Sequence, residues 1–400
     1  MGRHLPKTLV IAGMFLSVGS LSCGRGQSWT QTGAPSNNWG AIACSADGSK
    51  LVAAAGSRFW GTSGGIYTSS NRGTNWTLTG APIGEWDSVA SSADGTKLIA
   101  APCGGNLYIS TNSGLTWITN SPSGCGVAAS SADGSVLVAL DGSIHFSTNS
   151  GLTWGSLLAV DMIGVACSAD GVWMAVFGNG GYVFSSSNSG ASWESPGAIP
   201  NPWYGDGAYE YFSVGSSVDG RILLVAAGRS RFSPPFAGLF SSTNSGQTWV
   251  SNSLPTNEGW QGAALSTDGT KGFVVNSLGQ VYSLPNPGGI WVSNSAPALS
   301  WQSVACSADG AVAYAAPSNG SIWKLLTAPS PLLGITSSSN SVRLSWLVPS
   351  ENLVLQQNAA LNVGAWSDVT NVPILNLSTL REEVALPAGA SATFYRLSVR

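Results

Sequence analysis

Aromatic side chains recur at one fixed distance before a repeated Asp-Gly pair. Five of the seven positions that lie eight residues before such an Asp hold Trp or Tyr: Trp39, Trp86, Tyr211, Trp260 and Trp301. Flat side chains gathered around one opening could stack on sugar rings or clamp a peptide. The same spacing fits aromatic residues that pack between repeated strands. The sequence leaves both roles open.

Groups for acid–base, metal or nucleic-acid chemistry are scarce in this chain. Only 9% of the 400 residues are charged, the net charge is -3, and the two histidines are His4 and His145. We therefore predict no cofactor, no metal site and no nucleic-acid partner. Many of the 19 acidic residues belong to the repeated pairs: Asp47, Asp94, Asp133, Asp170, Asp219, Asp268 and Asp309. This leaves few carboxylates for catalysis.

Two motifs alternate along the chain. The first is Ser-x-Asp-Gly, and the second is an octapeptide, STNSGLTW, that occurs unchanged at Ser110–Trp117 and Ser147–Trp154. Variants of the octapeptide stand at Ser69–Trp76, Ser186–Trp193 and Ser242–Trp249. Both motifs contain residues that favour tight turns between strands. A unit such as Trp86–Trp117 therefore predicts four short antiparallel strands, which is the pattern of a propeller blade.

The two ends of the repeat complement each other. The seventh unit, Ser295–Leu326, lacks a final turn and Trp strand, whereas Gly26–Pro35 resembles the fourth strand of another unit, Gly73–Pro82. We therefore predict an all-β fold in which residues 26–326 form a seven-bladed β-propeller closed by its N-terminal strand. Such closure removes the exposed edge that an open array would leave.

The segments outside the repeat predict export and a second domain. Arg3 and Lys7 precede an apolar run, Thr8–Val18, and small residues, so residues 1–22 read as a signal peptide. We expect a secreted, periplasmic or cell-surface protein without a transmembrane span; a lipid anchor at Cys23 is the alternative. After a linker at 327–331, short alternating strands predict a small β-sandwich at 332–400, of fibronectin or immunoglobulin type. Such modules are common on exported bacterial proteins, and the role of this one stays open.

The octapeptide resembles the Asp-box, or bacterial neuraminidase repeat, with Asn in place of Asp. Sialidases, some glucan hydrolases, sortilin-type receptors and photosystem II assembly-factor-like propellers carry this repeat. The resemblance implies a structural hairpin in which the Asn braces the turn and the Trp packs between blades. The residues that match are Asn71, Trp76, Asn112, Trp117, Asn149, Trp154, Asn188, Trp193, Asn244 and Trp249.

The resemblance also places function on the face opposite the boxes, where the loops vary most. The aromatic ring would form the floor of a ligand site there. Its rim would hold Arg58, Trp60, Trp203, Tyr204, Arg229 and Arg231. Cys103 and Cys125 fall on that face in adjacent repeats, so an exported protein could join them as a disulfide. Cys44, Cys167 and Cys306 stand where other units have Ser or Leu, which indicates packing.

Three functions remain open from the sequence. We predict an exported, monomeric, non-catalytic propeller that binds a glycan or a protein partner. The rival is a sialidase-like glycoside hydrolase, for which the resemblance requires arginines and a Tyr–Glu pair. The only residues that could supply them are Arg58, Arg229, Arg231, Tyr204 and Glu210. The third is an assembly factor for an exported or membrane protein complex.

Overall fold

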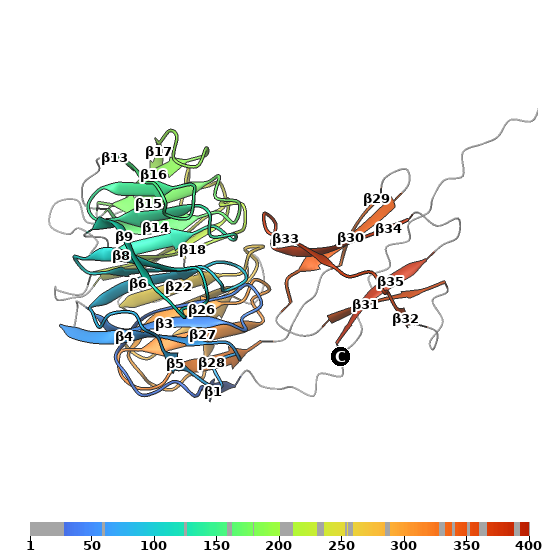
Figure 1. Ribbon diagram of the computed structural model, residues 1–400, viewed down its shortest axis with the longest axis horizontal. Coiled ribbons are helices and arrows are strands. Elements are labelled where there is room, and N and C mark those ends of the chain that lie inside the picture. Colours follow the sequence, from blue (N-terminus) through green and yellow to red (C-terminus); the bar gives the residue numbers. More distant parts are fainter. Residues whose placement is uncertain are drawn as a thin grey trace, which may run out of the picture.

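The computed structural model shows a chain built from strands (Figure 1). It describes residues 28–57, 61–123, 126–157, 162–178, 180–200, 211–229, 236–252, 254, 259–284, 289–327, 333–337, 341–349, 353–359, 366–387 and 393–399. Every regular element in these ranges is a β-strand, in agreement with the predicted all-β class.

Seven four-stranded antiparallel sheets form the larger unit. The first two sheets contain β2 (Trp39–Cys44), β3 (Leu51–Ser57), β4 (Thr62–Ser69) and β5 (Thr77–Leu78); and β6 (Trp86–Ser91), β7 (Leu98–Pro102), β8 (Asn106–Ser110) and β9 (Ile118–Ser123). The next two contain β10 (Val127–Ser130), β11 (Leu137–Leu140), β12 (Ile144–Ser147) and β13 (Gly155–Leu157); and β14 (Met162–Cys167), β15 (Met174–Gly178), β16 (Tyr182–Ser186) and β17 (Glu194–Ala198). Two more contain β18 (Tyr211–Ser216), β19 (Leu223–Arg229), β20 (Phe236–Ser242) and β21 (Val250–Ser251); and β22 (Trp260–Leu265), β23 (Gly272–Asn276), β24 (Val281–Leu284) and β25 (Val292–Asn294).

The remaining sheet of this unit joins the two ends of the repeat. It has the order β1-β28-β27-β26 and is built from β26 (Trp301–Cys306), β27 (Val312–Pro317), β28 (Trp323–Leu326) and β1 (Trp29–Gln31). Trp29 pairs with Leu325, and Gln31 pairs with Trp323. The N-terminal strand therefore pairs with the last strand of the repeat. The sequence predicted this pairing, because the seventh unit lacks a fourth strand and Gly26–Pro35 resembles one.

Local turn chemistry explains why each unit folds into one sheet. The first two strands of every sheet are joined by a Ser-x-Asp-Gly turn whose Gly has a φ between 61° and 71°, a region that glycine enters without strain. Each such turn also forms a backbone hydrogen bond from the Gly N–H to the Ser carbonyl oxygen, 2.9 Å long at Gly48. Since these signals lie within a few residues, each hairpin is specified locally.

The core lies between neighbouring sheets. The second strand of a sheet is covered on both faces; all five residues of β7 and of β15 are buried. Small and large side chains interdigitate there: Ala53 and Ala55 of one sheet pack with Val312 and Tyr314 of another. The first strands contact one another in the order β2, β6, β10, β14, β18, β22, β26, and β26 contacts β2.

A smaller unit follows. One of its sheets has the order β29-β30-β34-β33 and the other β32-β31-β35. Their strands are β29 (Gly334–Ser337), β30 (Ser341–Leu347), β31 (Leu353–Asn358), β32 (Ser367–Asp368), β33 (Ile374–Asn376), β34 (Arg381–Pro387) and β35 (Phe394–Val399). Leu344, Trp346, Leu355 and Val384 form its own buried core.

Candidate functional site

Four of the five aromatic residues that precede the repeated Asp-Gly pairs are buried. Trp39, Trp86 and Trp260 are 1% exposed, and Trp301 is fully covered. Trp39 donates its indole N–H to the carbonyl oxygen of Gly320 at 2.9 Å, and Trp86 does the same to Gly64 at 3.0 Å. This corrects the prediction of an exposed platform, because neighbouring sheets cover the ring faces that a ligand would need.

These indoles pack in the core between sheets instead. Trp39, Trp86 and Trp260 each meet a Tyr edge-on, with ring centroids 5.3–5.7 Å apart. Trp301 stacks on Trp29 of the N-terminal strand, with 6.0 Å between centroids. The second role that the sequence allowed, packing between repeated strands, is the one these four residues have.

The predicted rim of the loop face lies mostly outside the described residues. This applies to Arg58, Trp60, Trp203, Tyr204 and Arg231 of the rim, and also to Glu210 of the hydrolase alternative. Tyr211 begins β18 and Arg229 ends β19, and only their backbone is described. The rim, and the residues of the hydrolase alternative, stay predictions.

The five octapeptides form the same hydrogen-bonded turn. In one of them the Ser110 hydroxyl donates to the side-chain Oδ1 of Asn112 at 3.0 Å and accepts a hydrogen bond from the Gly114 N–H at 2.9 Å. Asn112 also accepts the Thr116 N–H at 2.9 Å. Equivalent Ser–Asn bonds of 2.9–3.0 Å involve Asn71, Asn149, Asn188 and Asn244. Both side chains are engaged by the turn itself.

The Trp of each octapeptide is half-buried at the edge of an inter-sheet core. Trp154 donates its indole N–H to Asn120 at 2.7 Å and to the carbonyl oxygen of Gly151 at 3.1 Å. The residues at this position are Trp76, Trp117, Trp154, Trp193 and Trp249. They join sheets rather than face a common site.

The repeated aspartates brace their turns. At all seven turns the Asp accepts a hydrogen bond of 2.6–2.7 Å from the preceding Ser hydroxyl. Burial by itself raises the pKa of Asp94, but hydrogen bonds from Ser92 and Thr96, with the charge of Lys50, hold that pKa below its ordinary value. The same balance lowers the pKa of Asp133. A lowered pKa favours the ionised form, so Asp94 and Asp133 are poorly suited to donate a proton in catalysis.

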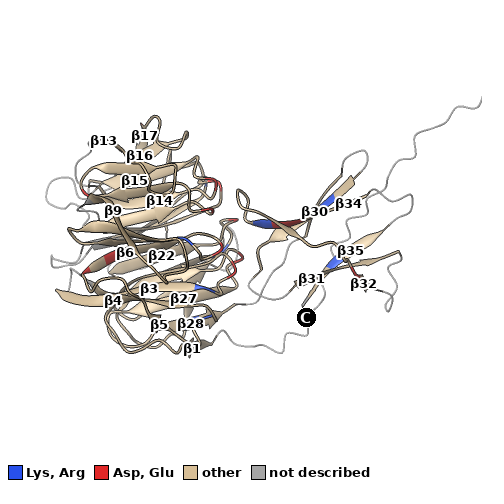
Figure 2. Cartoon of the chain, viewed as in Figure 1, with Lys and Arg blue, Asp and Glu red and all other residues tan. Residues whose placement is uncertain are grey.

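Few other reactive groups occur in the described residues, where Lys, Arg, Asp and Glu are sparse (Figure 2). His145 lies 2.9 Å from Asp141 through its Nε2 atom. Burial raises the pKa of the Cys44 and Cys167 thiols to about 12, and that of Cys306 well above its ordinary value.

Within the described ranges no group of three His, Cys, Asp or Glu side chains could hold a metal ion. No helix in those ranges is long and apolar enough to cross a membrane.

The predicted disulfide between Cys103 and Cys125 stays a prediction. Cys103 carries a free thiol in the structure. Cys125 lies outside the described residues.

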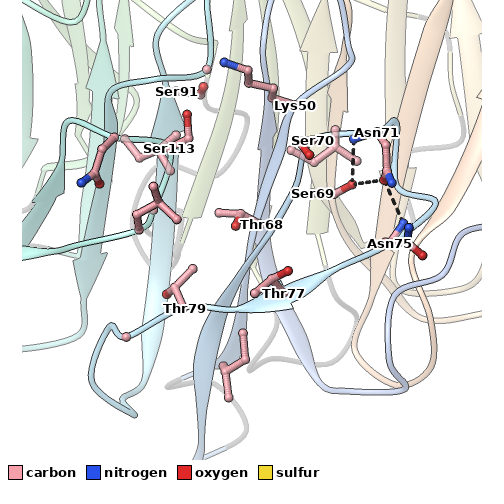
Figure 3. Close-up of a pocket in the computed structure, with 18 residues that line it drawn as sticks. Lys50, Thr68, Ser69, Ser70, Asn71, Asn75, Thr77, Thr79, Ser91 and Ser113 are labelled. Carbon is pink, nitrogen blue, oxygen red and sulfur yellow. Dashed lines mark hydrogen bonds between the residues drawn. The ribbon is translucent and has the colours of Figure 1, made fainter.

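A pocket of about 430 Å³ lies between the first two sheets, and the sequence did not reveal it (Figure 3). Thr68 of β4 and Thr77 of β5 line it, together with Thr79 and the octapeptide residues Ser69 and Asn71. Figure 3 shows the hydrogen bonds that join Ser69, Asn71 and Asn75 on one side of this pocket. Lys50 supplies the one charge in the lining, and its ammonium bonds the Asp94 carbonyl oxygen at 2.8 Å. The walls are otherwise rich in neutral hydroxyl and amide groups.

Two features beside this pocket are open to a ligand: exposed leucine side chains and the edge of a strand. Leu115 of the second octapeptide is 79% exposed, and Leu78 of β5 is 52% exposed. β5 is also the edge of its sheet, and no described strand pairs with its outer side. No signal in the sequence separates this pocket from the equivalent places between other sheets, because the octapeptides are nearly identical.

Comparisons with known proteins identify the fold. The β-propeller domain of Cps50 (Swd1) from Myceliophteria thermophila superposes with a TM-score of 0.57 at 12% identity, over 74% of this chain and 99% of that one. The larger unit is a β-propeller. YCF48 from Cyanidioschyzon merolae superposes with a TM-score of 0.52 at 12% identity, over 75% of this chain and 98% of that one.

A propeller enzyme is also similar. The GH74 xyloglucanase from Xanthomonas campestris superposes with a TM-score of 0.55 at 14% identity, over 82% of this chain but 54% of that one. No family model matches the chain, and no curated protein matches it. At these identities the likeness establishes the propeller fold and leaves the activity to the site.

Proposed function

We propose that this chain is an exported, non-catalytic β-propeller that binds a protein partner. In this proposal the propeller has seven blades, is closed by its N-terminal strand and carries an immunoglobulin-like sandwich at its C-terminus. The pairing of β1 with β28 and the contact of β26 with β2 support closure. The octapeptides are proposed to be Asp-boxes with Asn in the acidic position.

The chemistry of the described residues favours binding over hydrolysis. Most retaining and inverting glycosidases use two carboxyl groups that face each other across the substrate, whereas sialidases use a Tyr nucleophile. Here the seven repeated aspartates accept hydrogen bonds within their own turns. The sialidase-like alternative would have to use the loop residues Arg58, Arg229, Arg231, Tyr204 and Glu210.

The pocket beside β5 is the observation that carries the proposal. Its neutral hydroxyl and amide lining can satisfy the peptide groups of an extended segment, and the edge of β5 can pair with a main chain. Leu78 and Leu115 offer apolar contacts for its side chains. A glycan is less well served by the described residues, because four indoles that could have stacked on sugars are buried: Trp39, Trp86, Trp260 and Trp301. The proposed site is thus on the octapeptide side, and the loop-side site predicted from the sequence stays a separate proposal.

One of the similar propellers is solved with a peptide. YCF48 bound to D1 peptide superposes on this chain with a TM-score of 0.51 at 13% identity, over 76% of this chain and 95% of that one. That complex concerns YCF48 alone. It supports a peptide as a plausible class of ligand for a propeller of this shape, and it keeps the assembly-factor role among the proposals.

Selection from a random dodecapeptide library on the immobilised full chain tests the proposal. We expect enriched peptides whose affinity falls at least about tenfold in Leu115→Asp, since a buried leucine contact is worth about 1.5–3 kcal/mol. Leu152→Asp is the matched control: Leu152 occupies the same position in an identical octapeptide, is 82% exposed and does not line the pocket. Equal loss in both variants, or no enrichment, would contradict the proposed site.

A glycan array and a panel of fluorogenic glycosides, run with the same protein, separate the alternatives. We expect no saturable glycan binding and no turnover. Binding to glycans without enriched peptides would favour a carbohydrate partner. Turnover that disappears in Glu210→Gln would favour the sialidase-like hydrolase and end the non-catalytic proposal.

A further inference from the structure

One end of the propeller axis is ringed by backbone hydrogen bonds. The residue before each repeated Asp donates its N–H to the carbonyl oxygen of the equivalent residue in the next sheet, over 2.7–2.9 Å. The seventh bond returns from the last sheet to the first, so the bonds form a complete circle. Its members are Ala46, Ala93, Ala132, Ala169, Val218, Thr267 and Ala308. We call this set the axial ring.

The axial ring presents a shallow apolar surface. Five of its side chains are single methyl groups, and the largest is valine. The backbone groups that could interact with water are used by the ring itself. The surface can therefore accommodate branched apolar side chains without leaving polar atoms unpaired.

Two side chains of the smaller unit lie against this surface. Val348, which follows β30, and Leu380, which precedes β34, are 8% and 9% exposed and form one buried cluster with Ala46, Ala132 and Ala308. Ala93, Ala169 and Val218 pack around the same cluster. Figure 1 shows the smaller unit beside this end of the sheets, with the β33 end toward them. The contact joins residues that are far apart in the sequence.

The backbone holds these two side chains together as one tip. The Val348 N–H donates to the Leu380 carbonyl oxygen at 3.0 Å. Leu380 has a φ of 49°, in the left-handed region that a leucine rarely adopts. Such a conformation costs free energy and persists where surrounding contacts compensate for it. The contact with the axial ring is the compensation that the structure offers.

Other apolar residues of the smaller unit show that this burial is specific. Val372 is 82% exposed, and Ile374, the first residue of β33, is 74% exposed. Among the described apolar residues of the smaller unit, Val348 and Leu380 are the two that belong to the buried cluster with the axial ring.

We propose that the C-terminal module is a plug that docks on the axial ring through Val348 and Leu380. The docked module closes this end of the propeller axis. A ligand of the axis then has access from the opposite end alone. The proposal goes beyond the binding function proposed above and does not depend on it, since the pocket beside β5 is a different surface.

Small-angle X-ray scattering and hydrogen exchange of the full chain test the plug. For the wild type we expect the scattering of one compact particle in which both units keep a fixed arrangement. In Val348→Asp/Leu380→Asp we expect a larger radius of gyration, and at least about tenfold faster exchange in peptides that contain the Ala46, Ala132 and Ala308 turns, where local protection depends on coverage. Val372→Asp/Ile374→Asp, which changes two exposed residues of the same module, should behave as the wild type.

A second variant, on the propeller side of the contact, tests the same docking without any substitution in the smaller unit. Ala132→Gln/Ala308→Gln enlarges the axial ring without touching the smaller unit and should separate the units to the same extent. Circular dichroism and the thermal midpoint report whether each variant is folded, and an unfolded one is set aside in favour of the other. A wild type that already scatters as two independently moving units overturns the proposal. So do folded variants that leave scattering and exchange unchanged.

Discussion

At the scale of single residues, a buried serine hydroxyl organises each Asp-Gly turn. Ser131 is fully buried; its hydroxyl donates to Asp133 at 2.7 Å and accepts the Val136 N–H at 3.0 Å. The equivalent serine does the same at every turn, as the hydrogen bonds of Ser45, Ser92 and Ser168 show. A residue whose type looks unremarkable in the sequence therefore satisfies two groups that would otherwise be unpaired.

We predict that Ser131→Ala lowers the free energy of unfolding by about 1–3 kcal/mol, because the buried Val136 N–H loses its acceptor. Urea unfolding followed by tryptophan fluorescence measures the change. The control is Ser135→Ala in the same turn. Ser135 also donates to Asp133, at 2.7 Å, but at the exposed side of the turn, so its loss should cost at most about 0.5 kcal/mol. Equal effects would show that burial is not what makes Ser131 important.

The buried thiols should resist alkylation at a pH where ordinary thiols react. Only the thiolate attacks iodoacetamide, and burial raises the pKa of Cys44 and Cys167 to about 12 from the usual 9.0. At pH 9 we expect their labelling in the native protein to be roughly 500-fold slower than in urea, because half of an ordinary thiol but only about a thousandth of a thiol with a pKa of about 12 is ionised there. Labelling should accelerate as the pH rises toward 12. Mass spectrometry of the two peptides measures the rates; native rates close to those in urea would refute the prediction.

At the scale of elements, the octapeptide turn depends on two consecutive residues with positive φ. Ser113 has a φ of 57° and Gly114 a φ of 86°. A Cβ atom on Gly114 would lie 2.8 Å from Cγ2 of Thr68 in the preceding sheet. The turn therefore closes its own hairpin and sets how closely two sheets approach.

We predict different effects on the unfolding free energy for substitutions at Gly114 and at Ser113. Gly114→Ala should lower the unfolding free energy by more than about 1 kcal/mol, from backbone strain and the contact with Thr68. Ser113→Gly should leave it within about 0.5 kcal/mol, since the relief of strain offsets the greater freedom of the unfolded chain. Thermal and urea unfolding measure both. A destabilising Ser113→Gly would mean that its side chain, rather than the backbone geometry, is required.

At the scale of the whole molecule, the N-terminal strand joins the beginning of the chain to its last propeller sheet. Trp29 is 9% exposed, pairs with Leu325 and stacks on Trp301. If the propeller closes through this strand, as proposed, its loss exposes the edge of β28 and weakens every sheet indirectly.

We predict that Trp29→Ala lowers the unfolding free energy by about 3–5 kcal/mol, the usual cost of a buried Trp truncation. The propeller should still unfold in a single transition, because the closing strand supports all of its sheets together and its loss weakens them together. Calorimetry measures both. Trp366→Ala, at a half-buried Trp of the smaller unit that packs under Arg396, should cost less and leave the propeller transition in place. A propeller transition unmoved by Trp29→Ala would contradict the role of the N-terminal strand.

Local patterns in the sequence were sufficient for the sheets. Asp-Gly and Asn/Gly turns recur within each unit, and hairpins form between residues that are close along the chain, so four-stranded sheets followed from the repeat. The pairing of the N-terminal strand with the last sheet of the repeat also followed, because the seventh unit lacked a fourth strand and the N-terminus supplied one.

Only the tertiary structure decided what the repeated residues face. Trp39 and Trp301 have the same spacing whether they line an opening or pack between sheets, and burial by a neighbouring sheet settled the question. Val348 and Leu380 look like ordinary apolar residues at strand ends, yet they meet the axial ring. The physical reason is distance: turns depend on residues a few positions apart, whereas exposure depends on surfaces brought together from hundreds of positions away.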